Sequence, residues 1–216
     1  MDNDSGCLTG VVIDHLVYGT SDLDGTVARL ADLGVALSPG GQHVGLGTRN
    51  HLADLGGGAF LEVIGVDPEQ PEPAQPRPFG IDALSGERLI TWAVRVDGID
   101  TAIAAARAAG CDPGPARDMR RDRPDGVRLS WRLTAPPAPE LDGLVPFLID
   151  WADTPHPSAS AARGVRLVEL RASHPEPAAV VSWLDALGVR ADLAVTAGPR
   201  TFTAVLQTPS GLLELA

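Results

Sequence analysis

Lysine is absent from this sequence of 216 residues: all 17 basic side chains are arginine, set against 28 Asp and Glu, for a formal net charge of −11. Without lysine, the chain can neither form a Schiff base with a substrate nor clamp a phosphate with an ammonium group. A surface of this sign repels nucleic-acid backbones and anionic lipid. We therefore expect neither nucleic acid nor a membrane among its partners.

Cysteine and long apolar runs are scarce as well. The two cysteines, Cys7 and Cys111, have no neighbouring cysteine or histidine, which excludes a disulfide framework and a zinc knuckle. No run reaches 18 apolar residues, and the stretch Met1 to Gly10 lacks both the basic and the apolar region of a secretory leader. Together these absences predict a soluble, cytoplasmic protein.

The signature motifs of several enzyme classes are also missing. The chain contains no serine-hydrolase elbow (GxSxG), no phosphate-binding loop ending in lysine and no HExxH zinc motif. The glycines at Gly45 and Gly47 lead into a strand rather than a helix, so they do not predict a phosphate cradle.

What the chain does contain is a repeat. The segments 22–34, 98–110 and 176–188 each have apolar residues three and four apart and end in glycine, which is typical of a short amphipathic helix. An apolar strand precedes each helix, and three strand-like stretches follow it. The pattern predicts an α+β fold of repeated βαβββ units, two of which form a curved mixed sheet around an open trough.

Proline marks the boundaries between the units. Clustered prolines cannot supply the backbone donors of a helix or a central strand, so the proline-rich stretches are expected to be linkers. An odd third unit leaves a sheet edge that must be covered, which is one reason to expect a homodimer. The units are expected at 10–67, 88–152 and 164–216, with linkers at 68–87 and 153–163.

The first unit carries residues that resemble a known superfamily. They are Ile13-Asp14-His15-Leu16-Val17 on the first strand, Gly47 to Leu52 leading into the third, and Phe60 to Pro68 on the fourth. With the tandem βαβββ arrangement, they resemble the vicinal oxygen chelate superfamily, which includes glyoxalase I, extradiol dioxygenases and bleomycin-resistance proteins. The closer match is its glyoxalase-like branch. The resemblance covers 11–151 and, more weakly, the third unit.

The resemblance implies a divalent metal on the trough floor, bound by residues from the first and last strands of each unit. His15 and Glu62 stand at these positions in the first unit, and imidazole with carboxylate suits Zn, Ni, Fe, Mn or Co. Counting from the helix-closing glycines, the second-unit counterparts are Thr91 and Leu148, which are not normal metal ligands. Two alternatives stay open: a site without metal, and a buried hydrogen bond that involves His15 and Glu62.

The third unit offers another set of ligands. By the same count, Glu169 corresponds to His15 and Glu214 corresponds to Glu62. If the first and third units faced each other, these four groups would form a quartet able to bind a metal.

Other polar and aromatic residues are candidates for substrate contact. An arginine in the trough suits a carboxylate or enediolate oxygen, and tryptophan rings stack on flat ligands. The candidate bases are Glu214 and Asp150, the latter two residues after Leu148 on the same strand face. His156 would serve as acid or base if the second linker crossed the trough mouth. The candidate substrate-binding residues are His43, Asn50, Trp92, Arg121 and Trp131.

Two functions remain open at this point. The first is a metal-dependent isomerase or lyase that acts on a small metabolite by enediolate-type chemistry, with the metal at His15 and Glu62. The second is a metal-free protein that binds or sequesters a small molecule, as the resistance branch of the superfamily does. The gaps at Thr91 and Leu148 favour the second function.

Overall fold

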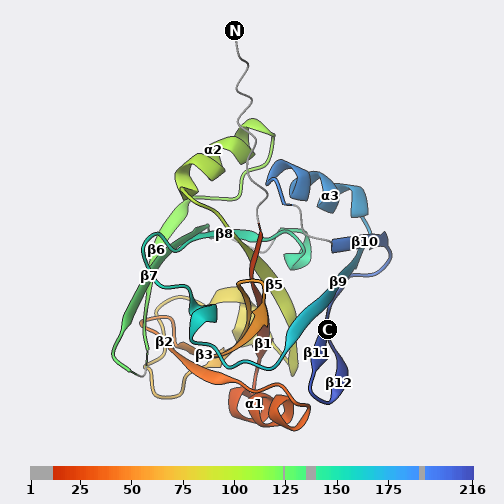
Figure 1. Ribbon diagram of the computed structural model, residues 1–216. Coiled ribbons are helices and arrows are strands. Elements are labelled where there is room, and N and C mark those ends of the chain that lie inside the picture. The colour runs from red at the N-terminus through yellow and green to blue at the C-terminus, as the bar shows by residue number, and fades with distance from the viewer. Residues whose placement is uncertain (1–11, 124, 135–139, 190–192) are drawn as a thin grey trace.

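The structure is a computed structural model that describes residues 12–123, 125–134, 140–189 and 193–216 (Figure 1). Cys7 and the rest of the stretch Met1 to Gly10 lie outside these residues. No helix among the described residues combines the length and the apolar character needed to cross a membrane.

A strand, a helix and three strands follow one another three times along the described chain. Unit one contains β1 (Val12–Thr20), α1 (Leu23–Asp32), β2 (Ser38–His43), β3 (Thr48–Gly56) and β4 (Ala59–Val66). Unit two contains β5 (Glu87–Arg95), α2 (Ile99–Ala108), β6 (Ala116–Asp122), β7 (Arg128–Thr134) and β8 (Phe147–Asp150). Unit three contains β9 (Arg166–His174), α3 (Pro177–Ala186), β10 (Leu193–Ala197), β11 (Thr201–Thr208) and β12 (Gly211–Leu215). Short 3-10 helices, η1 (Pro78–Ala83), η2 (Glu140–Gly143) and η3 (Pro157–Ala159), lie in the connections.

Local signals in the sequence explain where the helices begin and end. α1 follows Asp22, whose carboxylate accepts a hydrogen bond from the Gly25 N–H at 3.1 Å. α3 begins with Pro177, whose missing N–H needs no partner in a first turn. Gly34 follows α1 with a φ of +86°, the left-handed conformation that ends many helices. All three helices lie within the segments that the sequence predicted to be helical.

Units one and two share a single sheet. Its strand order is β1-β4-β3-β2-β6-β7-β8-β5, and it closes into a barrel because β5 pairs antiparallel with β1. Among the described residues, β2 and β6 are joined by one residue pair, Gln42 with Asp122. The sheet-dominated α+β architecture is as predicted, but this sheet closes on itself where the sequence predicted an open trough.

Unit three forms a separate sheet with the order β10-β9-β11-β12. Its first strand pairs with β10 and β11, whereas the first strands of units one and two pair with the last strands of their own units. The sheet packs against the outside of the barrel (Figure 1), where the rings of Trp92 and Phe202 have centroids 6.4 Å apart. The alternative in which the first and third units face each other is therefore wrong, because unit two completes the barrel with unit one.

Two apolar cores result from this arrangement. The outer core lies between the barrel and its cover, and it includes Leu30 of α1, Ile103 of α2 and Phe202 of unit three. The inner core lies inside the barrel and includes Val17 and Phe60. Because side chains alternate along a strand, β1 and β4 supply residues to both cores.

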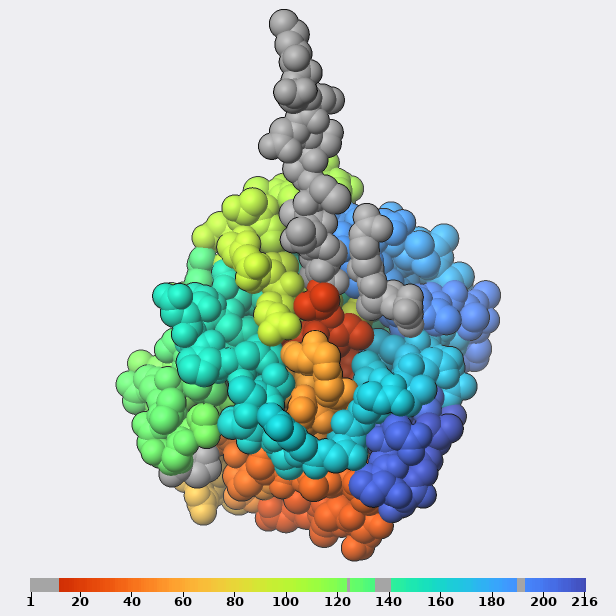
Figure 2. Space-filling view, in the orientation of Figure 1, coloured from red at the N-terminus to blue at the C-terminus, as the bar shows by residue number. Residues whose placement is uncertain are grey.

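Both linkers also contribute to the inner core. Ile81 from η1 and Ala161 after η3 are buried there. In Figure 2 the second linker lies across the front of unit one, and its Ala162 forms a parallel bridge with Ala53 of β3. Both linkers therefore supply buried side chains to the barrel interior.

Asp150 provides a test of how unit two is held together. Its carboxylate accepts hydrogen bonds from the N–H groups of Gly98 and Ile99 at the start of α2, both at 3.1 Å. We expect Asp150→Ala to lower the free energy of unfolding by about 1 kcal/mol, since helix N-terminal donors lose their acceptor. Urea unfolding measures this, with Asp153→Ala as the matched control, because exposed Asp153 accepts no hydrogen bond among the described residues. Equal stability of the two variants would contradict the assignment.

Candidate functional site

An irregularity in β1 brings two neighbouring side chains into the wall and the interior of the barrel. The pairing of β1 with β5 shifts between Ile13 and His15, which leaves Asp14 without a partner on β5. A bulge of this kind releases adjacent residues from the strict alternation of a strand. As a result both Asp14 and His15 are buried, with exposed fractions of 0% and 5%.

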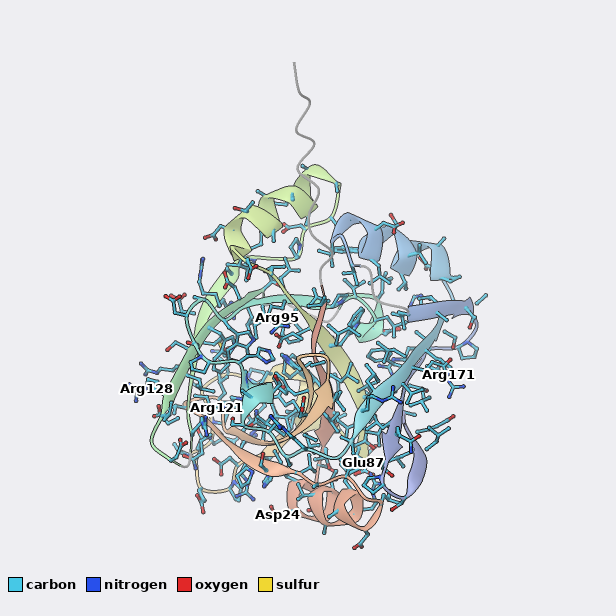
Figure 3. The ribbon with its side chains drawn as sticks, viewed as in Figure 1. Asp24, Glu87, Arg95, Arg121, Arg128 and Arg171 are labelled. Carbon is cyan, nitrogen blue, oxygen red and sulfur yellow. The ribbon has the colours of Figure 1, made fainter. Side chains whose placement is uncertain are left out.

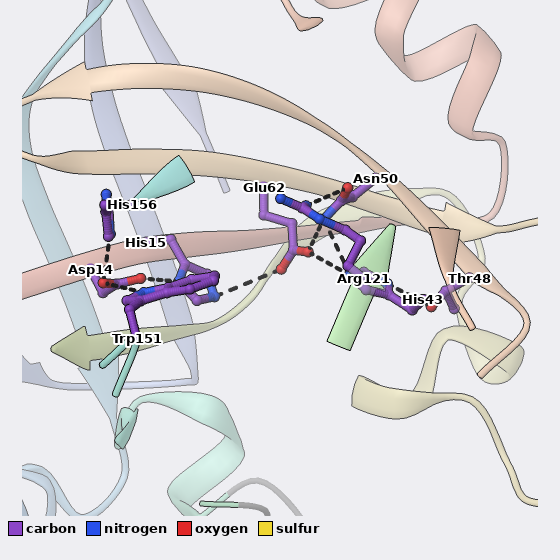
Figure 4. Close-up of polar contacts among 9 residues, drawn as sticks. All are labelled: Asp14, His15, His43, Thr48, Asn50, Glu62, Arg121, Trp151 and His156. Carbon is purple, nitrogen blue, oxygen red and sulfur yellow. Dashed lines mark hydrogen bonds and ion pairs between the residues drawn. The ribbon is translucent and has the colours of Figure 1, made fainter. Parts of the chain in front are cut away.

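Asp14 is surrounded by hydrogen-bond donors (Figure 4). Its Oδ1 lies 2.7 Å from His15 Nδ1, and its Oδ2 lies 3.0 Å from Trp151 Nε1 and 2.8 Å from His156 Nε2. Burial alone would raise the pKa of Asp14, but the hydrogen bonds and charges of the two imidazoles hold it well below its usual range. Asp14 is therefore an ionised carboxylate inside the protein.

The ionised Asp14 determines the tautomers of both histidines. A carboxylate only accepts hydrogen bonds, so His15 donates from Nδ1 and His156 donates from Nε2. The other nitrogen of His156, Nδ1, accepts from the Ser158 N–H at 3.3 Å, in agreement with this assignment. With its proton on Nδ1, the neutral form of the His15 ring would present the lone pair of Nε2 to the barrel interior.

Glu62 on β4 is the second buried carboxylate. Its Oε2 lies 3.7 Å from His15 Nε2, which is too far for a hydrogen bond. Its Oε1 accepts a hydrogen bond from Asn50 Nδ2 at 2.5 Å, and Asn50 Oδ1 accepts one from Arg121 Nη1 at 2.9 Å. The Asn50 amide therefore connects the carboxylate of unit one to a guanidinium of unit two.

That guanidinium is held inside the barrel. Arg121 is 3% exposed, and its Nε has no hydrogen-bond partner among the described residues. Gly40 leaves room for the group, since a Cβ there would lie 2.1 Å from Asn50 Oδ1 and 2.8 Å from Arg121 Nη1. Figure 3 shows Arg121 within the barrel, whereas Arg128 and Arg171 lie at the periphery.

His43 at the end of β2 completes the polar cluster. Its Nε2 lies 3.6 Å from Glu62 Oε1 and 3.3 Å from the donor Asn50 Nδ2, and its Nδ1 lies 3.0 Å from Thr48 Oγ1. Burial lowers the pKa of His43 to about 4. His43 is therefore neutral at pH 7.

Aromatic rings line the space around these groups. Phe60 stacks on His15 with ring centroids 4.7 Å apart, and Phe147 presents its edge to His15 at 5.4 Å. Trp131 lies at 6.5 Å from the His43 ring. The polar groups therefore sit in an apolar enclosure, where electrostatic interactions are stronger than in water.

The barrel interior brings together residues that the sequence analysis selected one by one. Strands from both units contribute to the cluster, so it depends on the pairing of units one and two. The predicted residues that meet here are His15, His43, Asn50, Glu62, Arg121 and Trp131.

The structure places three other predicted residues elsewhere. Trp92 is on the outer face of β5, against unit three. Asp150 caps α2, as described above. Glu214 lies on the exposed face of the unit-three sheet, where it forms an ion pair with Arg171, as Glu169 does more loosely at 3.7 Å. None of these three lies beside His15, so the expected positions of the two candidate bases and of one tryptophan need correction.

The residue of unit two that corresponds to Glu62 lies one position before Leu148, the counterpart predicted from the sequence. In unit one Val17 pairs with Glu62, and in unit two Ala93 pairs with Phe147. The interior counterpart of Glu62 is therefore Phe147, whereas Leu148 points into the outer core. A shift of one position exchanges the two faces of a strand.

The donor set can now be compared with the metal that the resemblance implies. Unit one supplies His15 Nε2 and Glu62 Oε2, but unit two supplies Thr91 and Phe147 at the matching positions. The described residues contain no group of three or more His, Cys, Asp or Glu side chains arranged to hold a metal ion. Protein metal sites use three or four such donors. The residues present therefore do not fit a divalent metal.

Sequence reasoning missed the residues that orient His15. Asp14 offered a signal, because a carboxylate within an apolar strand must find donors when it is buried. Trp151 and Phe147 offered none, since their roles depend on how β8 meets β1 in space. His156 was noted as a linker residue, and the structure places it on Asp14.

Comparisons with known proteins agree with this architecture. A family model described as "Glyoxalase-like domain" matches residues 13–188. Among solved structures, a hypothetical protein from Staphylococcus aureus superposes with a TM-score of 0.72 at 13% identity, over 95% of this chain and 99% of that one. The Mn(II)-bound glyoxalase from Novosphingobium aromaticivorans superposes with a TM-score of 0.50 at 13% identity, over 96% of this chain and 81% of that one. A search of curated proteins found no significant match.

The lowered pKa of His43 predicts a pH dependence of stability. The unfolded chain takes up a proton at this ring near pH 6.5, whereas the folded protein does so only near pH 4. The neutral state of His43 therefore contributes to the free energy of unfolding above pH 6.5. This contribution falls by about 2 to 3 kcal/mol as the pH is lowered to 4. We expect His43→Gln to reduce the loss between pH 7 and pH 4 by this amount in urea unfolding. The same loss in both proteins would contradict the buried, neutral state.

Proposed function

This chain belongs to the glyoxalase-like domain family of the vicinal oxygen chelate superfamily, and from that premise we propose that it binds a small hydroxy or oxo carboxylic acid inside the barrel. Binding does not depend on a divalent metal. Unit one supplies acceptors for the ligand, and unit two supplies the cation that receives its carboxylate.

The unpartnered Nε of Arg121 carries this proposal. A buried guanidinium normally saturates its donors, because each unmet N–H costs free energy. Arg121 is buried with one described side-chain acceptor, Asn50 Oδ1, and a carboxylate is the group that arginine binds best through two parallel hydrogen bonds. A ligand carboxylate would supply the missing acceptors.

The acceptors in unit one define the rest of the ligand. His15 Nε2 and Glu62 Oε2 face each other across 3.7 Å with no donor between them among the described residues. A ligand hydroxyl next to the carboxylate would donate into this gap. The complementary molecule therefore has an acceptor at one end and a donor close by, as in a 2-hydroxy acid or the enol of a 2-oxo acid.

The positive charge in this interior comes from Arg121 rather than from a metal ion, because the set of metal ligands among the described residues is incomplete. The Mn(II)-bound glyoxalase similar to this chain carries its own metal, but here Thr91 and Phe147 stand where unit two would have to provide donors. This difference supports binding through the guanidinium.

A second function is supported by the tautomer of His15. With Nδ1–H on Asp14, the free Nε2 can take a proton from the carbon next to a ligand carbonyl. The electrons of that C–H bond then move to the carbonyl oxygen, and Asp14 stabilises the imidazolium until the proton returns. The net result is proton exchange at that carbon, with no oxidant or co-reactant.

The binding proposal predicts a loss of affinity on removal of one charge. Arg121→Gln should weaken binding of lactate about tenfold or more, because charge-assisted hydrogen bonds disappear. Isothermal titration calorimetry measures this on protein freed of metal by a chelator, and addition of Mn²⁺ should leave the wild-type affinity unchanged. Arg117→Gln is the matched control, since Arg117 is an exposed arginine on the same strand that does not line the hollow described below. Lactate affinity that needs Mn²⁺, or that survives Arg121→Gln, would refute the proposal.

The exchange proposal has a separate test. Wild-type protein should accelerate the exchange of pyruvate methyl protons in D₂O, followed by proton NMR, and His15→Gln should lower the rate about 100-fold. Pyruvate binding measured alongside should change little, because the keto acid has no hydroxyl to donate to His15 and its carboxylate still meets Arg121. Exchange at the uncatalysed rate in the wild type would leave the protein a binder and refute the catalytic function.

A further inference from the structure

A hollow of about 890 Å³ shares one wall residue, Trp131, with the surroundings of the polar cluster. It lies where the barrel is weakly closed, near the β2–β6 junction that the Gln42–Asp122 pair holds. Its apolar wall comes from the turn after β2 and from β6 and β7, and consists of Val44, Leu46, Met119 and Trp131. The segment that follows β8 forms the opposite side, where Thr154 Oγ1 donates to Ser130 O at 2.7 Å.

The rim of the hollow is charged. It includes Asp118, Arg120, Arg132, Asp150 and Asp153. Most of these charges are already engaged: Arg132 pairs with Asp100 at 2.7 Å and with Asp118 at 3.4 Å, and Asp150 caps α2. The opening of the hollow is therefore lined by charged, hydrated side chains, whereas its wall is apolar.

The hollow is adjacent to the anion position proposed above. Met119 and Arg121 lie two residues apart on β6, so their side chains leave the same face about 7 Å apart. Met119 is paired directly with Trp131 across β6 and β7. Trp131 in turn reaches from the hollow to within 6.5 Å of the His43 ring centroid. Arg121 does not itself line the hollow, so Met119 and Trp131 are the residues that lie between the hollow and the guanidinium.

We propose that the hollow binds the flat apolar body of the ligand while its acid group reaches Arg121, so that the ligand class is an aromatic hydroxy or oxo acid. This inference rests on the proposed function and narrows its substrate class. The hollow falls in the range of pockets for drug-sized ligands, roughly 300–1,000 Å³, and is far larger than a three-carbon acid requires. Its wall of one indole and three aliphatic side chains suits a ring, which buries apolar area and stacks on tryptophan.

The inference is tested with three probes on the full chain by isothermal titration calorimetry. They are 3-phenyllactate, which has the ring and the acid; lactate, which has the acid alone; and 3-phenyllactamide, which has the ring and a neutral head. We expect 3-phenyllactate to bind about tenfold or more tightly than either of the others. Equal affinities of 3-phenyllactate and lactate would overturn the inference and leave the proposed function standing.

A pair of exposed valines gives matched variants for the same experiment. Val44 is 50% exposed and lines the hollow, whereas Val127 is 44% exposed and does not. Val44→Asp should remove most of the advantage of 3-phenyllactate over lactate, and Val127→Asp should leave that advantage unchanged. Because both positions are at the surface, neither variant is expected to disturb folding.

The variants also separate the two proposals. Loss of lactate and 3-phenyllactate binding in Arg121→Gln supports both of them. If 3-phenyllactate still binds to Arg121→Gln but not to Val44→Asp, the ring site stands and the anion site fails. If Val44→Asp and Val127→Asp behave alike toward 3-phenyllactate, the hollow is not the ring site.

Discussion

The site depends on one buried anion, Asp14. The bulge in β1 moves this carboxylate out of register with β5. Three N–H donors then converge on it, one from the adjacent His15 and two from the distant Trp151 and His156. Removing any donor would leave part of a buried charge unsatisfied, which costs several kcal/mol. The same hydrogen bonds join β1, the end of β8 and the second linker, so the group that orients His15 also joins the barrel to the segment that covers it.

Unit three does not join the barrel of units one and two but forms a separate sheet. Units one and two close their sheet around a polar interior, and unit three covers the barrel from outside with Phe202 against Trp92. Its sheet has a different strand order, because β9 pairs with β10 and β11 rather than with β12. Similar order along the sequence therefore does not guarantee similar pairing in space, and residues at equivalent sequence positions, such as Glu62 and Glu214, end in unrelated surroundings.

Much of this could be predicted from the sequence, for identifiable reasons. Helix periodicity and the closing glycines are local signals, so the three helices were located well. His15 and Glu62 were selected because the resemblance implies metal ligands on the first and last strands of each unit. The errors arose where the result depended on register: a count off by one exchanged Phe147 with Leu148, and Trp92 was assigned to the inner face. No local pattern could reveal that Trp151 and His156 meet at Asp14.

The charge balance of the interior explains why Asn50 lies at its centre. Glu62 and Arg121 are opposite charges in a space of low dielectric constant, yet no direct ion pair forms between them in the described structure. Instead, the amide of Asn50 donates to one and accepts from the other, which compensates both charges while leaving Glu62 Oε2 and Arg121 Nε free. A direct, bidentate ion pair would have consumed these atoms. The separation costs stability but preserves one acceptor and one donor inside the barrel, and such a pair is what a small polar ligand requires for recognition.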